Sequence, residues 1–179
     1  MKPKSESANV LSKYGFKQIM PANVLEEDDH EAYPSRLRGE KWVNECLKPV
    51  LHPSVPDEVA FLFEMARGSM IYGMYFLPLA ALATEEGFRV LEAGVRHRCK
   101  QLGIGKKGKP NSFPDNPYAD LVKALHNAGT IPKKDLDNWL SLVFLRNNFS
   151  HRTSAAIRSR HEAISQLSYI AELLNRLFK

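Results

Sequence analysis

An arginine and a histidine lie close together in residues 145–151, where an apolar run with helical spacing ends. Arginine carries a permanent charge on a planar fork that fits phosphate oxygens, and histidine can give or take a proton near neutral pH. Arg146 and His151 could therefore hold the charge of a phosphate group and transfer a proton, the two requirements for cleaving RNA without a metal. On a helix, Asn147 and His151 share a face, while Arg146 lies about a quarter turn away.

These three residues also have a plainer interpretation. Cations and polar side chains are favoured at the C-terminal end of a helix, where they interact with unpaired carbonyl groups and with the helix dipole. Arg146, Asn147 and His151 would then stabilise the end of a helix and take no part in chemistry.

This spacing resembles the signature of the HEPN superfamily of small helical ribonucleases. In that signature a histidine follows an arginine after four residues, and the first of these four is usually polar, as Asn147 is here. The expected order of helices over residues 58–179 also matches a HEPN bundle. The resemblance implies a homodimer in which two copies of the motif form one composite active site. In that site His151 would act as base or acid, Arg146 would stabilise charge on the phosphoryl oxygens, and Asn147 would position His151 or the phosphate.

The resemblance further implies a substrate and a biological setting. RNA would be cleaved by attack of a ribose 2′-hydroxyl on the adjacent phosphorus, without a metal or a cofactor. Many members act as toxins or in anti-phage defence, so an antitoxin or another regulatory protein would be a natural partner. Some HEPN domains are instead non-catalytic modules for dimerisation or ligand binding. The sequence leaves both alternatives open, and the catalytic one is preferred here.

An acidic residue on an early helix often faces the arginine and histidine of HEPN domains. Glu92 is the candidate, because a carboxylate near His151 would orient its ring and one near Arg146 would hold the guanidinium in place. The alternative is a solvated helical residue that pairs with Arg89 or Arg96. Two neighbouring glutamates could serve instead: Glu85 and Glu86.

The chain is basic, with 25 Lys and Arg against 20 Asp and Glu and a net charge of +5. A basic excess favours polyanionic partners, nucleic acid first, although an ordinary solvated surface explains it equally well. If RNA binds, its backbone would be contacted by basic residues on either side of the motif. The candidates are Arg96, Arg98, Lys106, Lys107 and Arg152.

Two other patterns carry no site. Residues 103–108 spell GxGxxG, but they follow a helix and lead to a proline, whereas a dinucleotide site requires a preceding strand and a following helix. Metal-ligand residue types occur at residues 28–30 and at His97 and Cys99, without a partner that completes a site. We therefore expect neither a metal nor a cofactor.

The cysteine content and the N-terminus suggest a cytoplasmic protein. Cys46 and Cys99 are far apart, so no disulfide framework is expected, and the polar first residues do not form a secretory signal. Residues 68–83 contain no charged residue but are shorter than the roughly 20 residues of a membrane helix. The expectation is a buried central helix and no membrane association, with a membrane helix as the alternative.

Apolar residues at helical spacing predict an all-α fold. Residues 1–56 contain many prolines and short apolar pieces, and they form an irregular N-terminal arm in which residues 42–47 make one or two helical turns. Residues 57–179 form a HEPN-like bundle of about five helices. The expected helices run from residue 57 to about Pro78, and over residues 79–102, 118–127, 132–150 and 155–177.

Overall fold

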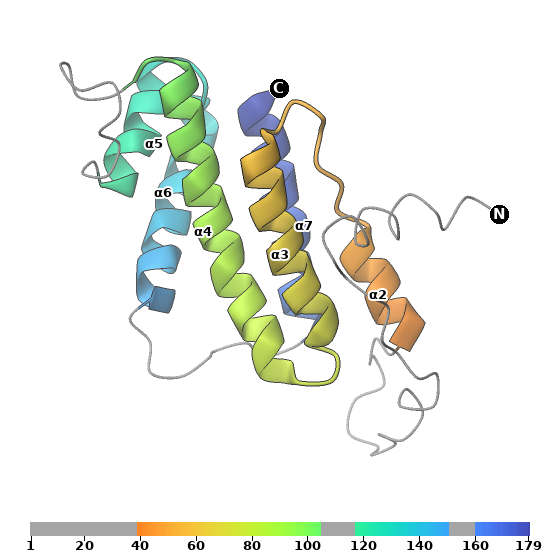
Figure 1. Cartoon of the computed structure of the whole chain (residues 1–179). Helices are drawn as coiled ribbons and strands as arrows, with labels where there is room; N and C mark the ends of the chain where they lie inside the picture. Colours follow the sequence, from red (N-terminus) through yellow and green to blue (C-terminus); the bar gives the residue numbers. More distant parts are fainter. Residues whose placement is uncertain (1–38, 105–116, 151–159) are drawn as a thin grey trace.

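A computed structural model describes residues 39–104, 117–150 and 160–179 of the chain, and in these residues it has six α-helices and no strand (Figure 1). This confirms the predicted all-α class. The prediction of one or two helical turns within residues 42–47 is also confirmed. The helices are α2 (Gly39–Leu47), α3 (Asp57–Tyr72), α4 (Leu77–Gln101), α5 (Tyr118–Asn127), α6 (Lys133–Ser150) and α7 (Arg160–Phe178).

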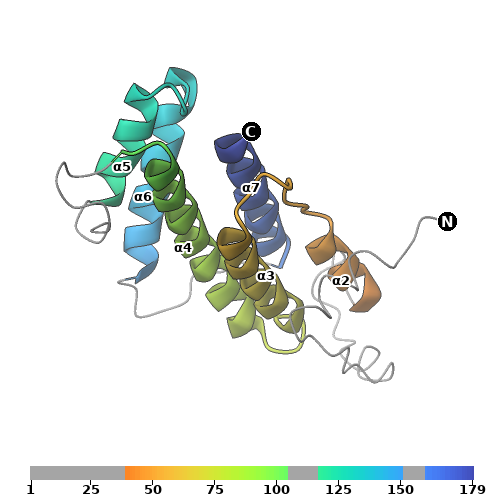
Figure 2. The same cartoon turned by 45° about the horizontal axis from the view of Figure 1, so that its top comes forward.

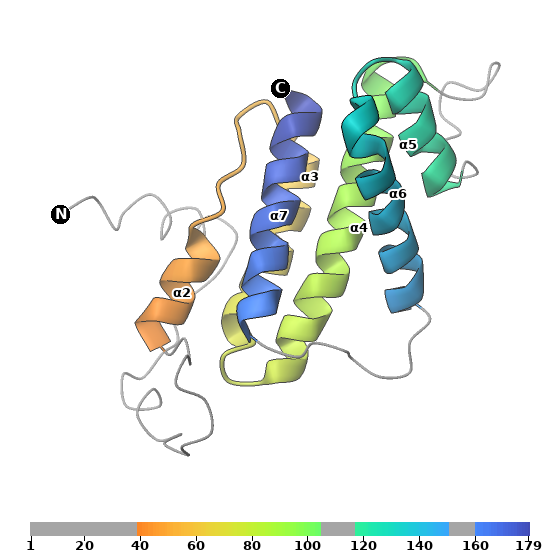
Figure 3. The ribbon, with the colours of Figure 1, turned by 180° about the vertical axis from the view of Figure 1, so that it is seen from behind.

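The long helix α4 lies at the centre of the bundle. It contacts α3 and α7 on one side and the pair α5 and α6 on the other, as the views from the front and from behind show (Figures 1 and 3). Helix α2 packs against α3 and α7 at the edge furthest from α5 and α6 (Figure 2). Helices α3, α5, α6 and α7 therefore all contact α4.

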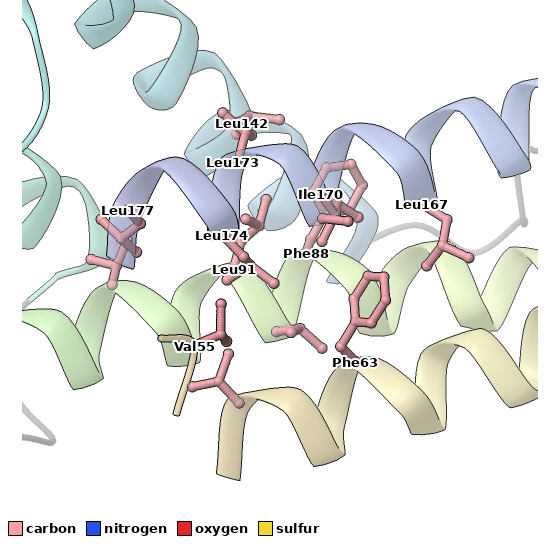
Figure 4. Packing of buried hydrophobic residues seen from close by; sticks show 14 of the residues in the cluster. Val55, Phe63, Phe88, Leu91, Leu142, Leu167, Ile170, Leu173, Leu174 and Leu177 are labelled. Carbon is pink, nitrogen blue, oxygen red and sulfur yellow. The ribbon is translucent and has the colours of Figure 1, made fainter. Parts of the chain in front are cut away.

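Large apolar side chains of α3, α4 and α7 fill the space between these helices (Figure 4). Phe63, Leu91 and Leu174 are fully buried there, and removing such side chains from water is the main source of stability in a small domain. Two glycines let α4 approach α7 closely. A Cβ at Gly87 would lie 2.4 Å from Ile170 Cδ1, and one at Gly94 would lie 2.7 Å from a terminal carbon of Leu174.

The uncharged run of residues 68–83 is divided between two helices. Helix α3 ends at Tyr72 and α4 begins at Leu77, with Pro78 in the first turn of α4. The run therefore does not form a single central helix. Two helices meeting at Pro78 were expected, and the first one ends earlier, at Tyr72. A proline in a first turn loses no helical hydrogen bond, because the N–H groups there have no partner within the helix. No helix of the described residues is long and apolar enough to cross a membrane.

Helix α2 is attached to the bundle by polar as well as apolar contacts. Trp42 is fully buried, and its Nε1 donates hydrogen bonds to the carbonyl oxygens of Met70 and Ile71 at 3.1 and 3.0 Å. Beside it, Arg67 forms an ion pair with Glu64 at 3.2 Å. The Arg67 guanidinium also donates to the carbonyl oxygen of Pro49, in the segment that joins α2 to α3.

Candidate functional site

Arg146 lies in the last part of α6 and points toward the middle of α4. Its Nε is 2.8 Å from Oε2 of Glu92, and this ion pair joins two helices that are far apart in the sequence. The Glu92 side chain is 13% exposed and that of Arg146 is 31% exposed, so the pair is partly shielded from solvent. The Nε–H of Arg146 is not aligned for a hydrogen bond, and the contact is electrostatic. The structure thus brings the predicted supporting carboxylate to the predicted arginine.

The second oxygen of Glu92 is used as well. Oε1 accepts hydrogen bonds from Nη2 and Nε of Arg96 at 2.7 and 3.1 Å, one turn further along α4. The two interpretations of Glu92, a helical pair with Arg96 and a partner for Arg146, therefore hold together, one on each oxygen. Two guanidinium groups therefore contact one carboxylate where α4 and α6 meet.

Tyr118, the first residue of α5, completes this cluster and was not among the predicted site residues. Its side chain is 7% exposed, and its hydroxyl has no hydrogen-bond partner within the described part of the chain. Burial raises the pKa of Tyr118, the nearby charge of Glu92 raises it further, and Arg146 and Arg96 act in the opposite direction. The hydroxyl therefore lies within the electrostatic reach of all three charged groups. We call Glu92, Arg96, Arg146 and Tyr118 the α4–α6 cluster.

Sequence spacing could not have indicated Tyr118, because the residue reaches the cluster only through the packing of α5 on α4. A contact one turn further along α5 shows this packing: the thiol of Cys99 lies 3.8 Å from the carbonyl oxygen of Leu121. A tyrosine directly after Pro117, at the start of a short amphipathic helix, was the one available signal. Tyrosine with an otherwise buried ring usually keeps its hydroxyl near a polar partner.

The other predicted site residues are distributed differently. Asn147 is exposed and accepts a hydrogen bond from Nη1 of Arg146 at 3.2 Å. Arg98 donates to Gln101 at 3.1 Å and lies 6.0 Å from the ring centroid of Phe178, so it faces the end of α7 and not the α4–α6 cluster. Four predicted residues lie outside the described residues: His151, Lys106, Lys107 and Arg152.

The surface of α6 near Arg146 also carries apolar side chains. Phe144 is 67% exposed, and Leu145 is exposed as well. Exposed apolar groups next to a polar site are typical of surfaces that contact another molecule.

No group of three or more metal-ligating side chains occurs in residues 39–104, 117–150 and 160–179. The two metal-ligand types near the end of α4 point apart. Nδ1 of His97 lies 3.8 Å from a carboxylate oxygen of Glu58, whereas Cys99 is buried against α5. Burial raises the pKa of the Cys99 thiol to about 11, which disfavours the thiolate that a metal would require.

Comparison with known proteins found no family model that matches the chain, and no curated protein or solved structure that matches it significantly. The chain is thus described by its own features: an all-α bundle with a partly shielded cluster of two arginines, one glutamate and one tyrosine between α4, α5 and α6.

Proposed function

We propose that this chain is a metal-independent endoribonuclease of HEPN type. The observation that carries the proposal is the ion pair between Arg146 and Glu92. An arginine that acts on a phosphoryl group has to be held in a fixed direction before the substrate arrives, because stabilisation of a transition state depends on preorganised charge. The ion pair provides such a constraint on Arg146, whose guanidinium fork fits phosphate oxygens.

In the proposed reaction the ribose 2′-hydroxyl attacks the adjacent phosphorus and the 5′-oxygen leaves. The products are a 2′,3′-cyclic phosphate and a 5′-hydroxyl end. His151 takes the proton of the 2′-hydroxyl or delivers one to the leaving oxygen, and Arg146 stabilises charge on the phosphoryl oxygens. Asn147, hydrogen-bonded to Arg146, positions the guanidinium or the phosphate. Single-stranded or loop RNA is the expected substrate, since its sugar can rotate into line for attack.

The proposal includes a homodimer with a composite active site, which the resemblance to HEPN ribonucleases implies. Exposed Phe144 and Leu145, next to Arg146, are suitable apolar residues for such a contact. A role as a toxin or in anti-phage defence, restrained by an antitoxin or another regulatory protein, follows by analogy with the same superfamily.

A non-catalytic module for dimerisation or ligand binding is the second candidate function. The exposed apolar side chains of α6 favour it, because they would serve a binding surface without any chemistry. Arg146 and Glu92 would then fix the shape of that surface. The two functions differ in one measurable respect, namely whether RNA cleavage depends on His151.

Cleavage of labelled total tRNA with EDTA present tests the proposal. We expect the wild type to produce 2′,3′-cyclic phosphate ends, and His151→Ala to lose about 10²- to 10⁴-fold of the rate, the usual contribution of one acid–base group. His52→Ala, in the segment between α2 and α3, is the matched control and should cleave like the wild type. Equal cleavage by all three proteins would indicate a contaminant, and no cleavage by any of them would favour the binding module.

A further inference from the structure

The hydroxyl of Tyr118 is buried at the start of α5, which packs on α4, and it makes no hydrogen bond within the described residues. The charges of Glu92, Arg146 and Arg96 act on it electrostatically. A buried polar atom without a partner destabilises the folded state, so the Tyr118 hydroxyl is expected to gain a partner in another state of the site. The cluster would lack a donor at Oε2 of Glu92 if Arg146 left it, and the Tyr118 hydroxyl can supply one. Glu92 interacts with Arg146 through Oε2, and Arg146 is also the residue that a phosphate group would bind.

A phosphate that binds the Nε edge of the Arg146 guanidinium competes with Glu92 for it, so the ion pair that orients Arg146 before binding is given up when RNA binds. When a phosphate oxygen takes Arg146, Oε2 of Glu92 loses its cation, although the Glu92 side chain is only 13% exposed and has limited access to water. Burying an unpaired carboxylate is costly. Arg96 cannot relieve this cost alone, because it already donates two hydrogen bonds to Oε1. A new donor is needed at Oε2.

We propose that Tyr118 is a positioning residue for Arg146: its buried hydroxyl donates a hydrogen bond to the Glu92 carboxylate when a phosphate group takes the Arg146 guanidinium. In the free protein Glu92 is paired with Arg146. In the phosphate-bound protein the Tyr118 hydroxyl takes the place of Arg146 at Glu92. The exchange makes Arg146 available at a lower cost in free energy, because the Glu92 carboxylate gains a hydrogen-bond donor. This inference rests on the proposed function, in which Arg146 binds the phosphate of RNA.

Tyr118→Phe is the direct test, because it removes one buried oxygen and leaves the ring. Binding is measured by fluorescence anisotropy with a 2′-O-methyl RNA oligonucleotide, which lacks the attacking hydroxyl and is not cleaved. The loss of a hydrogen bond to a charged group usually lowers affinity by about 10- to 100-fold, and we expect the affinity of Tyr118→Phe to fall in this range. Tyr169→Phe is the matched control. Its hydroxyl accepts a hydrogen bond from Asn138 between α6 and α7, and we expect no change in binding.

A double-mutant cycle with Glu92→Gln tests whether Tyr118 acts through Glu92. A neutral amide does not need a replacement cation, and its introduction removes a negative charge near the phosphate. Glu92→Gln should therefore bind the oligonucleotide more tightly than the wild type, and Tyr118→Phe should change affinity less than about twofold in this background. Glu85→Gln is the control for the lost charge, because Glu85 pairs with exposed Arg89 on the same helix.

Three results would overturn the inference: equal affinities of Tyr118→Phe and Tyr169→Phe, an unchanged Tyr118→Phe effect in the Glu92→Gln background, or no RNA binding by the wild type. If Glu92→Gln does not fold, the unsubstituted chain gives the answer. The ¹³Cζ NMR signal of Tyr118, identified by its loss in Tyr118→Phe, should shift when the oligonucleotide is added, and an unchanged signal contradicts the exchange. The proposed ribonuclease activity fails separately, if the wild type binds RNA in this manner but does not cleave it.

Discussion

Two of the glutamate–arginine clusters in the described residues differ in burial. The Glu64–Arg67 pair on α3 is 6% and 4% exposed and lies under α2. The α4–α6 cluster is built around Glu92, Arg96 and Arg146, and its arginines are partly open to solvent. In the first cluster one cation faces one carboxylate, whereas in the second two cations share one carboxylate.

The pKa shifts show what this difference means. Burial raises the pKa of Glu64, and the charge of Arg67 lowers it in part. Burial likewise lowers the pKa of Arg67, and Glu64 and Cys46 act in the opposite direction. Both groups are thus penalised for being charged, and neither can exchange its partner for a ligand from solvent. We infer that the Glu64–Arg67 pair fixes the position of α2, while the α4–α6 cluster has the solvent exposure and the guanidinium groups that an anion-binding site requires.

Arg67→Met has the largest expected effect on stability. The substitution leaves the Glu64 carboxylate buried without a cation and also removes the hydrogen bond to the carbonyl of Pro49. We expect the free energy of unfolding in urea to fall by about 3–5 kcal/mol, as is usual when one partner of a buried pair is removed. Arg89→Met, which breaks an exposed pair on α4, should cost less than about 1 kcal/mol.

Replacing both members, in Glu64→Leu/Arg67→Met, should recover most of the loss, because no uncompensated charge remains. A loss in the double variant as large as that in Arg67→Met would contradict this account of the cluster. The cause would then lie in the contact with Pro49 and the packing of α2.

The stability defect of Arg67→Met should depend on pH. Without Arg67 the pKa of Glu64 rises further, since the cation that lowered it is gone. Between the unfolded pKa, about 4.3, and the raised folded pKa, the folded state binds more protons than the unfolded state. Stability then falls as pH increases, by at most about 1.4 kcal/mol per pH unit. The difference from the wild type should be smaller at pH 5 than at pH 8.

Urea unfolding at the two pH values measures this difference. Glu64→Gln/Arg67→Met serves as the control, because its side chain at position 64 does not titrate. Its stability defect relative to the wild type should not increase from pH 5 to pH 8. A defect of equal size at pH 5 and pH 8 in Arg67→Met would mean that the charge of Glu64 is not the origin of the lost stability.

The helices themselves were largely predictable from the spacing of apolar residues. The expected bounds of α5 and α6 lie within one residue of the observed ones, because apolar side chains recur on one face and prolines or glycines mark the ends. The junction of α3 and α4 was misplaced. Pro78 can close one helix or open the next, and the sequence does not distinguish these cases without knowledge of the turn that precedes it.

The clusters were less predictable than the helices. Glu92 was a candidate partner of Arg146 through the resemblance to HEPN domains, since no sequence spacing relates residues on two separate helices. The sequence offers Arg96 and Arg146 as alternative partners of Glu92. It does not indicate that Glu92 pairs with both, with one oxygen for each arginine. The inclusion of Tyr118 and the burial of Glu64 with Arg67 depend on how α5 and α2 pack, which local patterns do not encode.

Arg146→Met has the smallest expected effect on stability and the clearest one on function. Arg96 keeps its hydrogen bonds to Oε1 of Glu92, and by the exchange proposed above the Tyr118 hydroxyl donates to the carboxylate in place of Arg146. The site is also partly exposed, so the free energy of unfolding should change by less than about 1 kcal/mol. RNA cleavage should nevertheless fall about 10²- to 10³-fold, as expected when one group that stabilises transition-state charge is lost. Arg176→Met, which breaks an exposed pair on α7, is the control and should retain both properties. If Arg146→Met were destabilised as strongly as Arg67→Met, both clusters would serve mainly to stabilise the fold. The exposure of Arg146 would then no longer support a role in binding phosphate.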